Sequence, residues 1–227
     1  MKKETFKKNL GQTEIVVVLD RSGSMMSIRQ ATVEGFNKFL SEQQNSEGEA
    51  FISLVQFDDR YEVNYTGIPV KDATPLILGE NFVPRGSTSL LDAIGKTIEE
   101  LKTDRDVIFV IITDGEENTS KTYKREAINN MIENLTKEEG WKFLFLAANQ
   151  DAIATGAGLG ISAGNSMSYA ATGDNTMNAW NSISANTSGY RSAKFGLFGT
   201  NGPNGVVGLD GLTDTIEFND SQRKDAK

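Results

Sequence analysis

Residues 15–25 read IVVVLDRSGSM, an aliphatic run followed by a short polar loop. The run from Ile15 to Leu19 has the length of a strand and consists of β-branched residues and leucine. Such an unbroken run is typical of a strand that is buried on both faces, as in parallel sheets. We therefore expect a central strand that carries Asp20 at its carboxyl end.

A second stretch repeats this pattern, because residues 106–115 read DVIFVIITDG. Stretches with helical spacing of apolar residues follow both aspartates, and strands that alternate with helices predict βαβ units around a mostly parallel sheet. We expect an α/β fold: a three-layer, Rossmann-like sandwich with helices on both faces of the sheet. Residues 61–70 alternate apolar and polar side chains before a proline turn, which predicts one antiparallel edge strand.

The chain divides into three predicted segments. Residues 1–12 form a basic N-terminal arm, residues 13–195 one folded domain, and residues 196–227 an irregular tail with a weak strand at 215–218. The arm contains Lys2, Lys3, Lys7 and Lys8, which we interpret as a solvated end. Inside the domain, further strands are expected at 51–57, 141–147 and 166–170, and further helices at 151–157 and 175–191.

Composition excludes several classes of chemistry. The 227 residues contain no cysteine and no histidine, so disulfides, thiolate metal sites and imidazole catalysis are ruled out. The net charge of −8 disfavours a nucleic-acid partner. No signal peptide is expected, and the longest apolar run, 107–112, is too short to cross a bilayer. We expect a cytoplasmic protein.

Oxygen-bearing side chains gather on the loops of this predicted sheet. Ligands of open α/β sheets bind beyond the carboxyl ends of the strands, where Asp20 and Asp114 are expected. Ser22 and Ser24 add hydroxyls at alternate positions of the first loop, and Thr88 lies on a second polar loop. Mg²⁺ prefers about six oxygen ligands, some of them waters, so these five residues are candidate metal ligands.

These residues resemble the metal-ion-dependent adhesion site of von Willebrand factor A domains. That pattern is Asp-x-Ser-x-Ser on one loop, a threonine on a second and an aspartate on a third, and all five positions match. The resemblance covers residues 13–195. Residues 19–25, 57–63, 90–98 and 141–152 are similar to stand-alone bacterial and phage members.

The resemblance implies a role for each residue. Ser22 and Ser24 would bind the ion directly, and Thr88 would bind directly or through water. Asp20 and Asp114 would accept hydrogen bonds from metal-bound waters, or one of them would coordinate. Mg²⁺ is expected, with Mn²⁺ or Ca²⁺ as alternatives. A glutamate or aspartate of a protein partner would complete the sphere, in a non-enzymatic module of a bacterial or phage-infected cell.

Two other readings of the same residues lead to different functions. A Mg²⁺-dependent phosphohydrolase with Asp20 as nucleophile needs an acid two residues later, where this chain has Ser22. An EF-hand starting at Asp20 needs glycine and glutamate where Met25 and Ala31 stand. An assembly role without metal dependence stays open.

Other charged residues have structural interpretations. Asp58 and Asp59 are expected in a turn, and Glu116 and Glu117 as solvated loop charges. Asp92 is expected in the first turn of a helix; the alternative is that it contacts a metal ligand without binding the metal itself. Arg21 either holds the fold or contacts an acidic partner. Trp141 and Trp180 are expected in the core.

Overall fold

The computed structural model describes residues 11–198 and 216–227, and a six-stranded sheet forms its centre. The strand order is β3-β2-β1-β4-β5-β6, with β3 antiparallel to β2 and every other neighbouring pair parallel. This arrangement confirms the predicted sheet and its antiparallel edge. The strands are β1 Gln12–Asp20, β2 Glu49–Phe57, β3 Tyr61–Pro69, β4 Asp106–Thr113, β5 Lys142–Ala148 and β6 Ser166–Tyr169.

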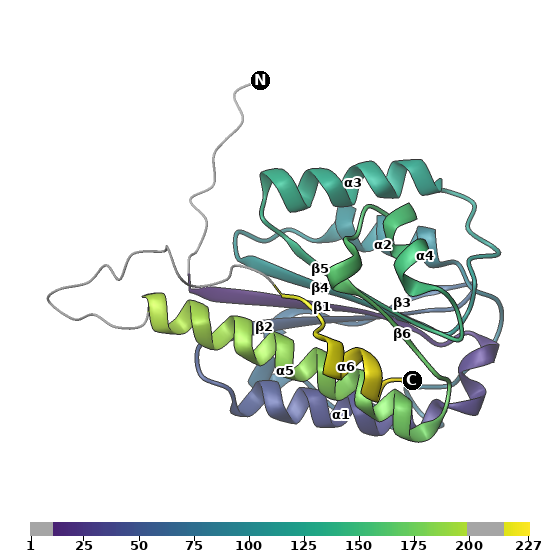
Figure 1. Cartoon of the computed structure of the whole chain (residues 1–227), viewed down its shortest axis with the longest axis horizontal. Coiled ribbons are helices and arrows are strands. Elements are labelled where there is room, and N and C mark those ends of the chain that lie inside the picture. The colour runs from purple at the N-terminus through teal and green to yellow at the C-terminus, as the bar shows by residue number, and fades with distance from the viewer. Residues whose placement is uncertain (1–10, 199–215) are drawn as a thin grey trace, which may run out of the picture.

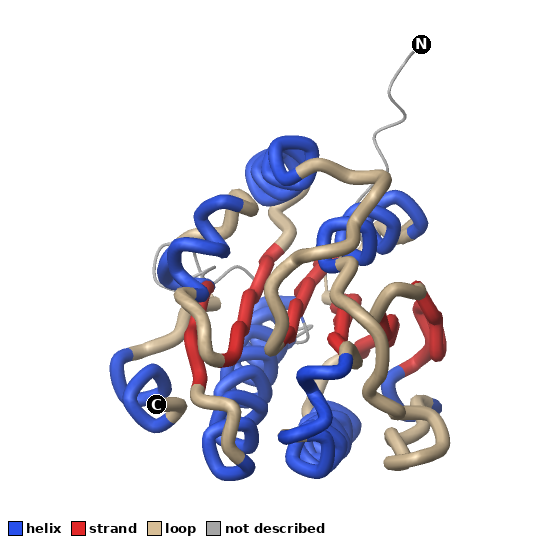
Figure 2. Tube along the Cα trace, turned by 90° about the vertical axis from the view of Figure 1, so that its right-hand side faces the viewer, coloured by secondary structure: helices blue, strands red, loops and turns tan. Residues whose placement is uncertain are grey.

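Helices cover both faces of this sheet, which confirms the three-layer sandwich (Figures 1 and 2). Helices α2, α3 and α4 lie on one face, and α1, α5 and α6 on the other. The α-helices are α1 Arg29–Asn45, α2 Leu90–Glu100, α3 Arg125–Glu138, α4 Ala152–Gly158, α5 Gly173–Phe198 and α6 Asp220–Asp225. The short 3-10 helices are Gly23–Ser27, Val70–Asp72 and Ala163–Asn165.

Strand β1 contributes to the core on both faces because successive side chains point to opposite sides. Ile15, Val17 and Leu19 pack with the α1 and α5 layer, whereas Val16 and Val18 pack with the α2 and α3 layer. All five side chains are fully buried. The aliphatic run thus fills two cores at once, and it holds the carboxyl end of β1 in a fixed place.

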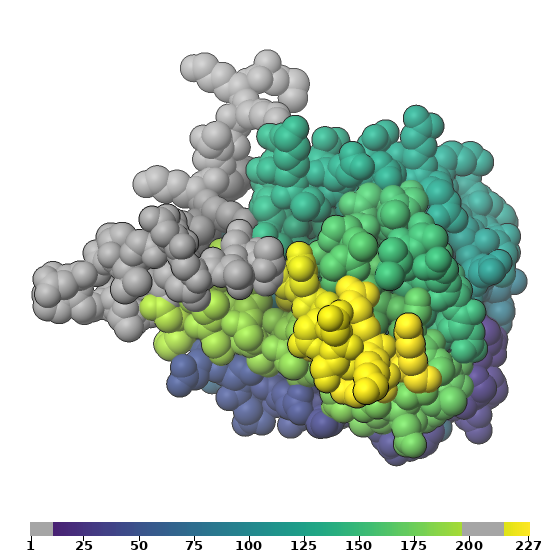
Figure 3. Space-filling model, viewed as in Figure 1, coloured from purple at the N-terminus to yellow at the C-terminus, as the bar shows by residue number. Residues whose placement is uncertain are grey.

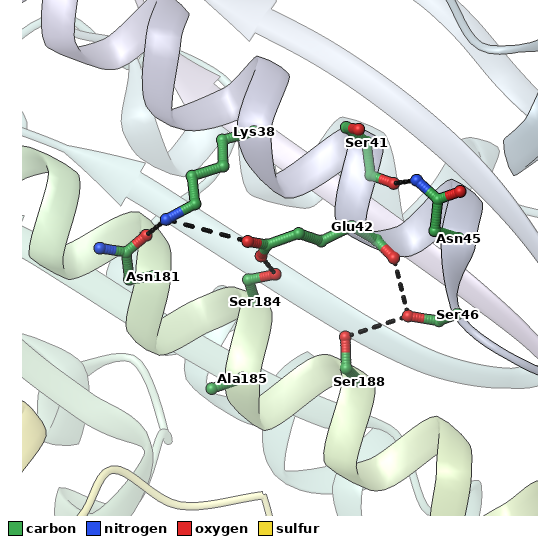
Figure 4. A pocket seen from close by; sticks show the side chains of 9 residues that line it. All are labelled: Lys38, Ser41, Glu42, Asn45, Ser46, Asn181, Ser184, Ala185 and Ser188. Carbon is green, nitrogen blue, oxygen red and sulfur yellow. Dashed lines mark hydrogen bonds and ion pairs between the residues drawn. The ribbon is translucent and has the colours of Figure 1, made fainter.

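The contact between α1 and α5 has an apolar and a polar part. Trp180 lies over Gly35, whose lack of a side chain makes room for the indole. The ring centroids of Trp180 and Phe36 are 5.7 Å apart. The groove between the helices is polar: Lys38 donates to Asn181, and Ser184 donates to Glu42 (Figure 4). The predicted core position of Trp180 is confirmed, and Trp141 is also buried, against Phe109 and Phe143.

The C-terminal segment departs from its predicted irregular character. Ile216, Phe218 and Ala226 are buried in the core on the α5 side, and α6 begins with a capping box between Asn219 and Gln222. The predicted strand at 215–218 is also wrong, because residues 216–219 carry no strand pairing. Figure 3 shows the segment, in yellow, lying over the green residues of α5 and β6. Three widely spaced apolar residues hold it in place.

Several boundaries differ from the prediction by a few residues. Helix α5 continues to Phe198 and so enters the predicted tail, and β1 already begins at Gln12. The predicted lysine-rich arm, with Lys2, Lys3, Lys7 and Lys8, lies outside the described residues. In the part of the chain that the structure describes, no helix is long and apolar enough to cross a membrane.

Candidate metal centre

Three loops meet at the carboxyl edge of the sheet. Loop 1 is residues 20–25 after β1, loop 2 is residues 84–89 before α2, and loop 3 is residues 113–119 after β4. Strands β1 and β4 are neighbours, with Leu19 paired to Ile112, so loops 1 and 3 leave the sheet side by side. Loop 2 joins loop 1 through two backbone hydrogen bonds, from Gly23 N to Gly86 O and from Arg85 N to Arg21 O.

The two aspartates have different surroundings. Asp20 is fully buried, and its two carboxylate oxygens accept hydrogen bonds from Ser22 N at 2.6 Å and from the Thr113 hydroxyl at 2.5 Å. Burial raises the pKa of Asp20 to about 6, although these hydrogen bonds lower it. Asp114 is partly exposed and accepts from Ser24 Oγ at 2.6 Å, and burial raises its pKa too.

Three hydroxyl groups face one small volume between these aspartates. The Oγ atoms of Ser22 and Ser24 are 3.0 Å apart. A methyl group added to Gly115 would lie 2.6 Å from Thr88 Oγ1, 3.3 Å from Ser24 Oγ and 3.4 Å from Ser22 Oγ. Hydroxyls from loops 1 and 2 therefore line a space at loop 3 that a carbon side chain would fill. The structure brings all five predicted residues together.

Comparison with known families agrees with this arrangement of loops. Residues 15–117 match the family model described as von Willebrand factor type A domain. Residues 15–117 are therefore similar to a von Willebrand factor type A domain. The matched residues run from β1 to loop 3 and so include all five candidate ligands. No curated protein sequence matches the chain.

Solved structures share the fold of this chain at low sequence identity. Proximal thread matrix protein 1 from the mussel byssus superposes with a TM-score of 0.56 at 15% identity, over 78% of this chain and 46% of that one. The pilus adhesin SpaC from Lactobacillus rhamnosus GG, in an open conformation, gives 0.60 at 14% identity, over 80% and 30%. The ArnB paralog VWA2 from Sulfolobus acidocaldarius gives 0.50 at 18%, over 79% and 45%.

This chain therefore spans less than half the length of each of these proteins. At such identities the similarity concerns the fold alone. One structure of the mussel protein has a zinc-occupied metal-ion-dependent adhesion site, which is a property of that protein.

The residues of this candidate centre fit a hard divalent cation. The donor set consists of oxygens alone, which suits Mg²⁺ better than soft metals. Among the described residues, neither Asp20 nor Asp114 forms an ion pair with a lysine or arginine, so their charges have no internal counter-ion. The described residues contain no group of three or more Asp, Glu, His or Cys side chains that could hold a metal. Hydroxyl oxygens would therefore have to provide most of the ligands that acids provide in other metal sites.

A buried charge network holds loops 1 and 2 in register. Asp58, fully buried after β2, accepts from Arg21 Nε at 3.0 Å and from Arg85 Nε at 2.9 Å. Glu62 binds both guanidinium groups, and the hydrogen bond from Arg21 is the main reason why its pKa falls to about 2. The structural role of Arg21 is confirmed, and the Asp58 turn is confirmed by its bond to Arg60 N.

Loop 3 is joined to loop 2 by side chains that the sequence did not link to the site. Asn118 Oδ1 accepts from Thr88 N at 3.0 Å, and Asn118 N donates to Thr88 O at 3.1 Å. Glu117 accepts from the backbone N–H groups of Leu91 and Ser120 at 2.9 and 2.8 Å. The prediction that Glu117 is a solvated charge is therefore wrong, because it caps the start of α2, whereas Glu116 is exposed as predicted.

Asp92 has the structural role that its position in the first turn of α2 predicts. Its carboxylate accepts hydrogen bonds from the backbone N–H groups of Lys121, Thr122 and Tyr123 at 2.8 to 2.9 Å. Burial raises the pKa of Asp92, but these three donors outweigh it and leave the pKa below its usual value. The residue thereby fixes the segment that leads from loop 3 to α3.

Proposed function

We propose that this chain is a von Willebrand factor type A domain that binds a divalent cation, Mg²⁺, at Asp20, Ser22, Ser24, Thr88 and Asp114. Through the cation it would bind a carboxylate that a protein partner presents, without catalysing a reaction. The convergence of three hydroxyl oxygens on the space beside Gly115 is the observation that supports the proposal. The two aspartates without an internal counter-ion agree with it.

The hydroxyl and the carboxylate side chains would have separate roles at the cation. Ser22, Ser24 and Thr88 offer neutral oxygens, so the ion keeps most of its positive charge. Asp20 holds loop 1 through Ser22 N and loop 3 through Thr113, and the Ser24 hydroxyl donates to Asp114, which leaves its lone pairs for the ion. When bound, the cation supplies a Lewis-acid centre that binds the carboxylate of a partner.

The rim is open on the side that a partner would approach. Ser24 is exposed and Asp114 is partly exposed, whereas Asp20, Ser22 and Thr88 are buried. An external aspartate or glutamate could thus reach the ion past Ser24 while the deeper ligands stay in place. This half-open geometry favours binding of a carboxylate from outside over a closed structural metal site.

Isothermal titration with Mg²⁺, Mn²⁺ and Ca²⁺ tests the proposal. We expect saturable uptake by the wild type and loss of uptake in Ser22→Ala and Asp114→Ala. Ser41→Ala, an exposed serine on α1 far from the loops in sequence, is the matched control and should bind like the wild type. Absence of uptake by the folded wild-type protein would refute the metal site.

The partner is tested by affinity capture in Mg²⁺ and in EDTA. A partner bound through the cation should be lost in EDTA and with Asp114→Ala. Equal recovery in both buffers would instead support an assembly role without metal dependence. Mg²⁺-dependent release of phosphate from a phosphate ester would contradict a non-enzymatic module, and we expect none.

A further inference from the structure

Strand β6 ends at Tyr169, on the same edge of the sheet as the candidate metal centre. The register pairs Thr113 with Ala147 and Ala148 with Tyr169, so Asp114, the residue after Thr113, lies at the same edge two strands away. Ala148 is the residue between them, and it contributes one methyl group. A tyrosine side chain is long enough to extend across a strand that carries so small a residue.

The face of the sheet is also the right one. Ile112, Leu146, Ala148 and Tyr169 all belong to the core on the α1 and α5 side. Alternate residues of a strand share a face, and Asp114 follows Ile112 by two. The row formed by Ile112, Leu146 and Met167 in the interior therefore continues at the edge as Asp114, Ala148 and Tyr169.

The hydroxyl of Tyr169 is buried without a partner. The side chain is 97% buried, since its relative exposure is 3%, and its oxygen forms no hydrogen bond with the described residues. Burial raises the pKa of Tyr169, and the nearby carboxylates of Asp114 and Asp20 raise it further. The register independently places Tyr169 at the edge of the sheet that carries Asp114, two strands away.

An unpaired buried hydroxyl is destabilising, and phenylalanine would fill the same core without that cost. A phenol is a hydrogen-bond donor, and carboxylates are acceptors that commonly bind through one bridging water. We propose that Tyr169 is a positioning residue of the metal centre. Its hydroxyl donates through one water molecule to the carboxylate of Asp114 and holds that carboxylate toward the cation. This inference rests on the proposed metal site.

Tyr169→Phe tests the inference, because it removes one oxygen and keeps the ring. We expect Mg²⁺ alone to bind roughly five- to tenfold more weakly in titration, the net effect of one ordinary hydrogen bond, because a water molecule lies between the hydroxyl and the charge. In EDTA the variant should melt at the same temperature as the wild type or higher, because no direct bond is lost. Its gain in melting temperature on addition of Mg²⁺ should be smaller.

Tyr65→Phe is the matched control, because Tyr65 is a half-buried tyrosine on the opposite edge strand β3. It should leave Mg²⁺ affinity unchanged. Equal affinity of Tyr169→Phe and wild type would overturn the role of Tyr169 and leave the metal site standing. No uptake by the wild type would overturn the metal site and, with it, this role. A lower melting temperature of Tyr169→Phe in EDTA, with unchanged affinity, would show a purely structural hydroxyl.

Discussion

Two neighbouring regions of the carboxyl edge each bury an aspartate completely, and they treat its charge in opposite ways. Asp58 lies between Arg21 and Arg85, so the chain supplies its counter-ions. Asp20 accepts from a backbone N–H and a hydroxyl, and burial raises its pKa to about 6. The buried charge of Asp20 is therefore costly to the metal-free fold.

This difference separates an acid with a structural role from one that fits the proposed metal site. A buried carboxylate that only holds loops together is stable when cations of the protein surround it. A carboxylate that must attract an ion from solution has to remain without such a partner. The Asp58 region therefore acts as the rigid frame, and the Asp20 region keeps the unbalanced charge that a cation would neutralise.

The largest effect should come from breaking the frame. Asp58→Ala leaves two guanidinium groups without their buried shared acceptor, with only the exposed Glu62 remaining, and we expect a loss of about 3–5 kcal/mol in the free energy of unfolding. Urea denaturation measures it. Asp59→Ala, at the exposed neighbouring position, should change stability by less than about 0.5 kcal/mol. Similar values for both variants would contradict the structural role of Asp58.

The next effect has the opposite sign. Asp20→Asn removes a buried charge whose pKa of about 6 lies roughly two units above the ordinary 3.8, which corresponds to about 3 kcal/mol. We expect the variant, in EDTA, to be about 2–3 kcal/mol more stable than the wild type at pH 7 and to bind no Mg²⁺. Asp58→Asn should be destabilised under the same conditions. If both variants changed stability in the same direction, the distinction between the Asp20 and Asp58 regions would fail.

The pH dependence of stability follows from the same pKa. In the folded protein Asp20 takes up its proton near pH 6, and in the unfolded chain near 3.8, so the folded state binds more protons between these values. Stability in EDTA should therefore rise as pH falls from 7 toward 4, by up to about 1.4 kcal/mol per pH unit from this group. Subtracting the curve of Asp20→Asn cancels the other acids. A flat difference curve would show that the charge of Asp20 is not costly.

The sequence was sufficient to predict which residues meet at the candidate metal centre, because they follow local rules. Asp20 and Asp114 each end an aliphatic run, and neighbouring parallel strands bring such ends to one edge. The sandwich followed from the alternation of strand and helix patterns. These features depend on periodicity and on strand ends, which any reader of the chain can find.

The supporting residues could not be found in this way. Arg21 reaches Asp58 and Glu62 across 37 and 41 positions, and Asn118 reaches Thr88 across 30. Such pairs have no local pattern, so their partners emerge only from the folded arrangement. The C-terminal segment is different, since the capping box from Asn219 to Gln222 is a local signal that the glycine-rich composition of residues 199–211 obscured.

The smallest of these effects tests whether the space beside loop 3 must stay free of carbon. The backbone of Gly115 is outside the left-handed region, so alanine is tolerated there, but its methyl group would lie 2.6 Å from Thr88 Oγ1. We expect Gly115→Ala to weaken Mg²⁺ binding about tenfold, or about 1.4 kcal/mol, with a small change in stability. Gly189→Ala, where an added methyl meets nothing within 4 Å on α5, should leave Mg²⁺ affinity unchanged.

Gly86, on loop 2 beside the Asp58 region, offers the converse substitution. Gly86 has a φ of +68°, and a methyl group there would collide with Asp59, so Gly86→Ala should lower stability first and Mg²⁺ affinity only as a consequence. If Gly115→Ala and Gly86→Ala instead changed stability and Mg²⁺ affinity in the same proportion, the Asp58 and Asp20 regions would not have separate roles. A loss of affinity confined to Gly115→Ala would place the cation at the hydroxyl cluster, because that methyl group alone enters the space which the three oxygens surround.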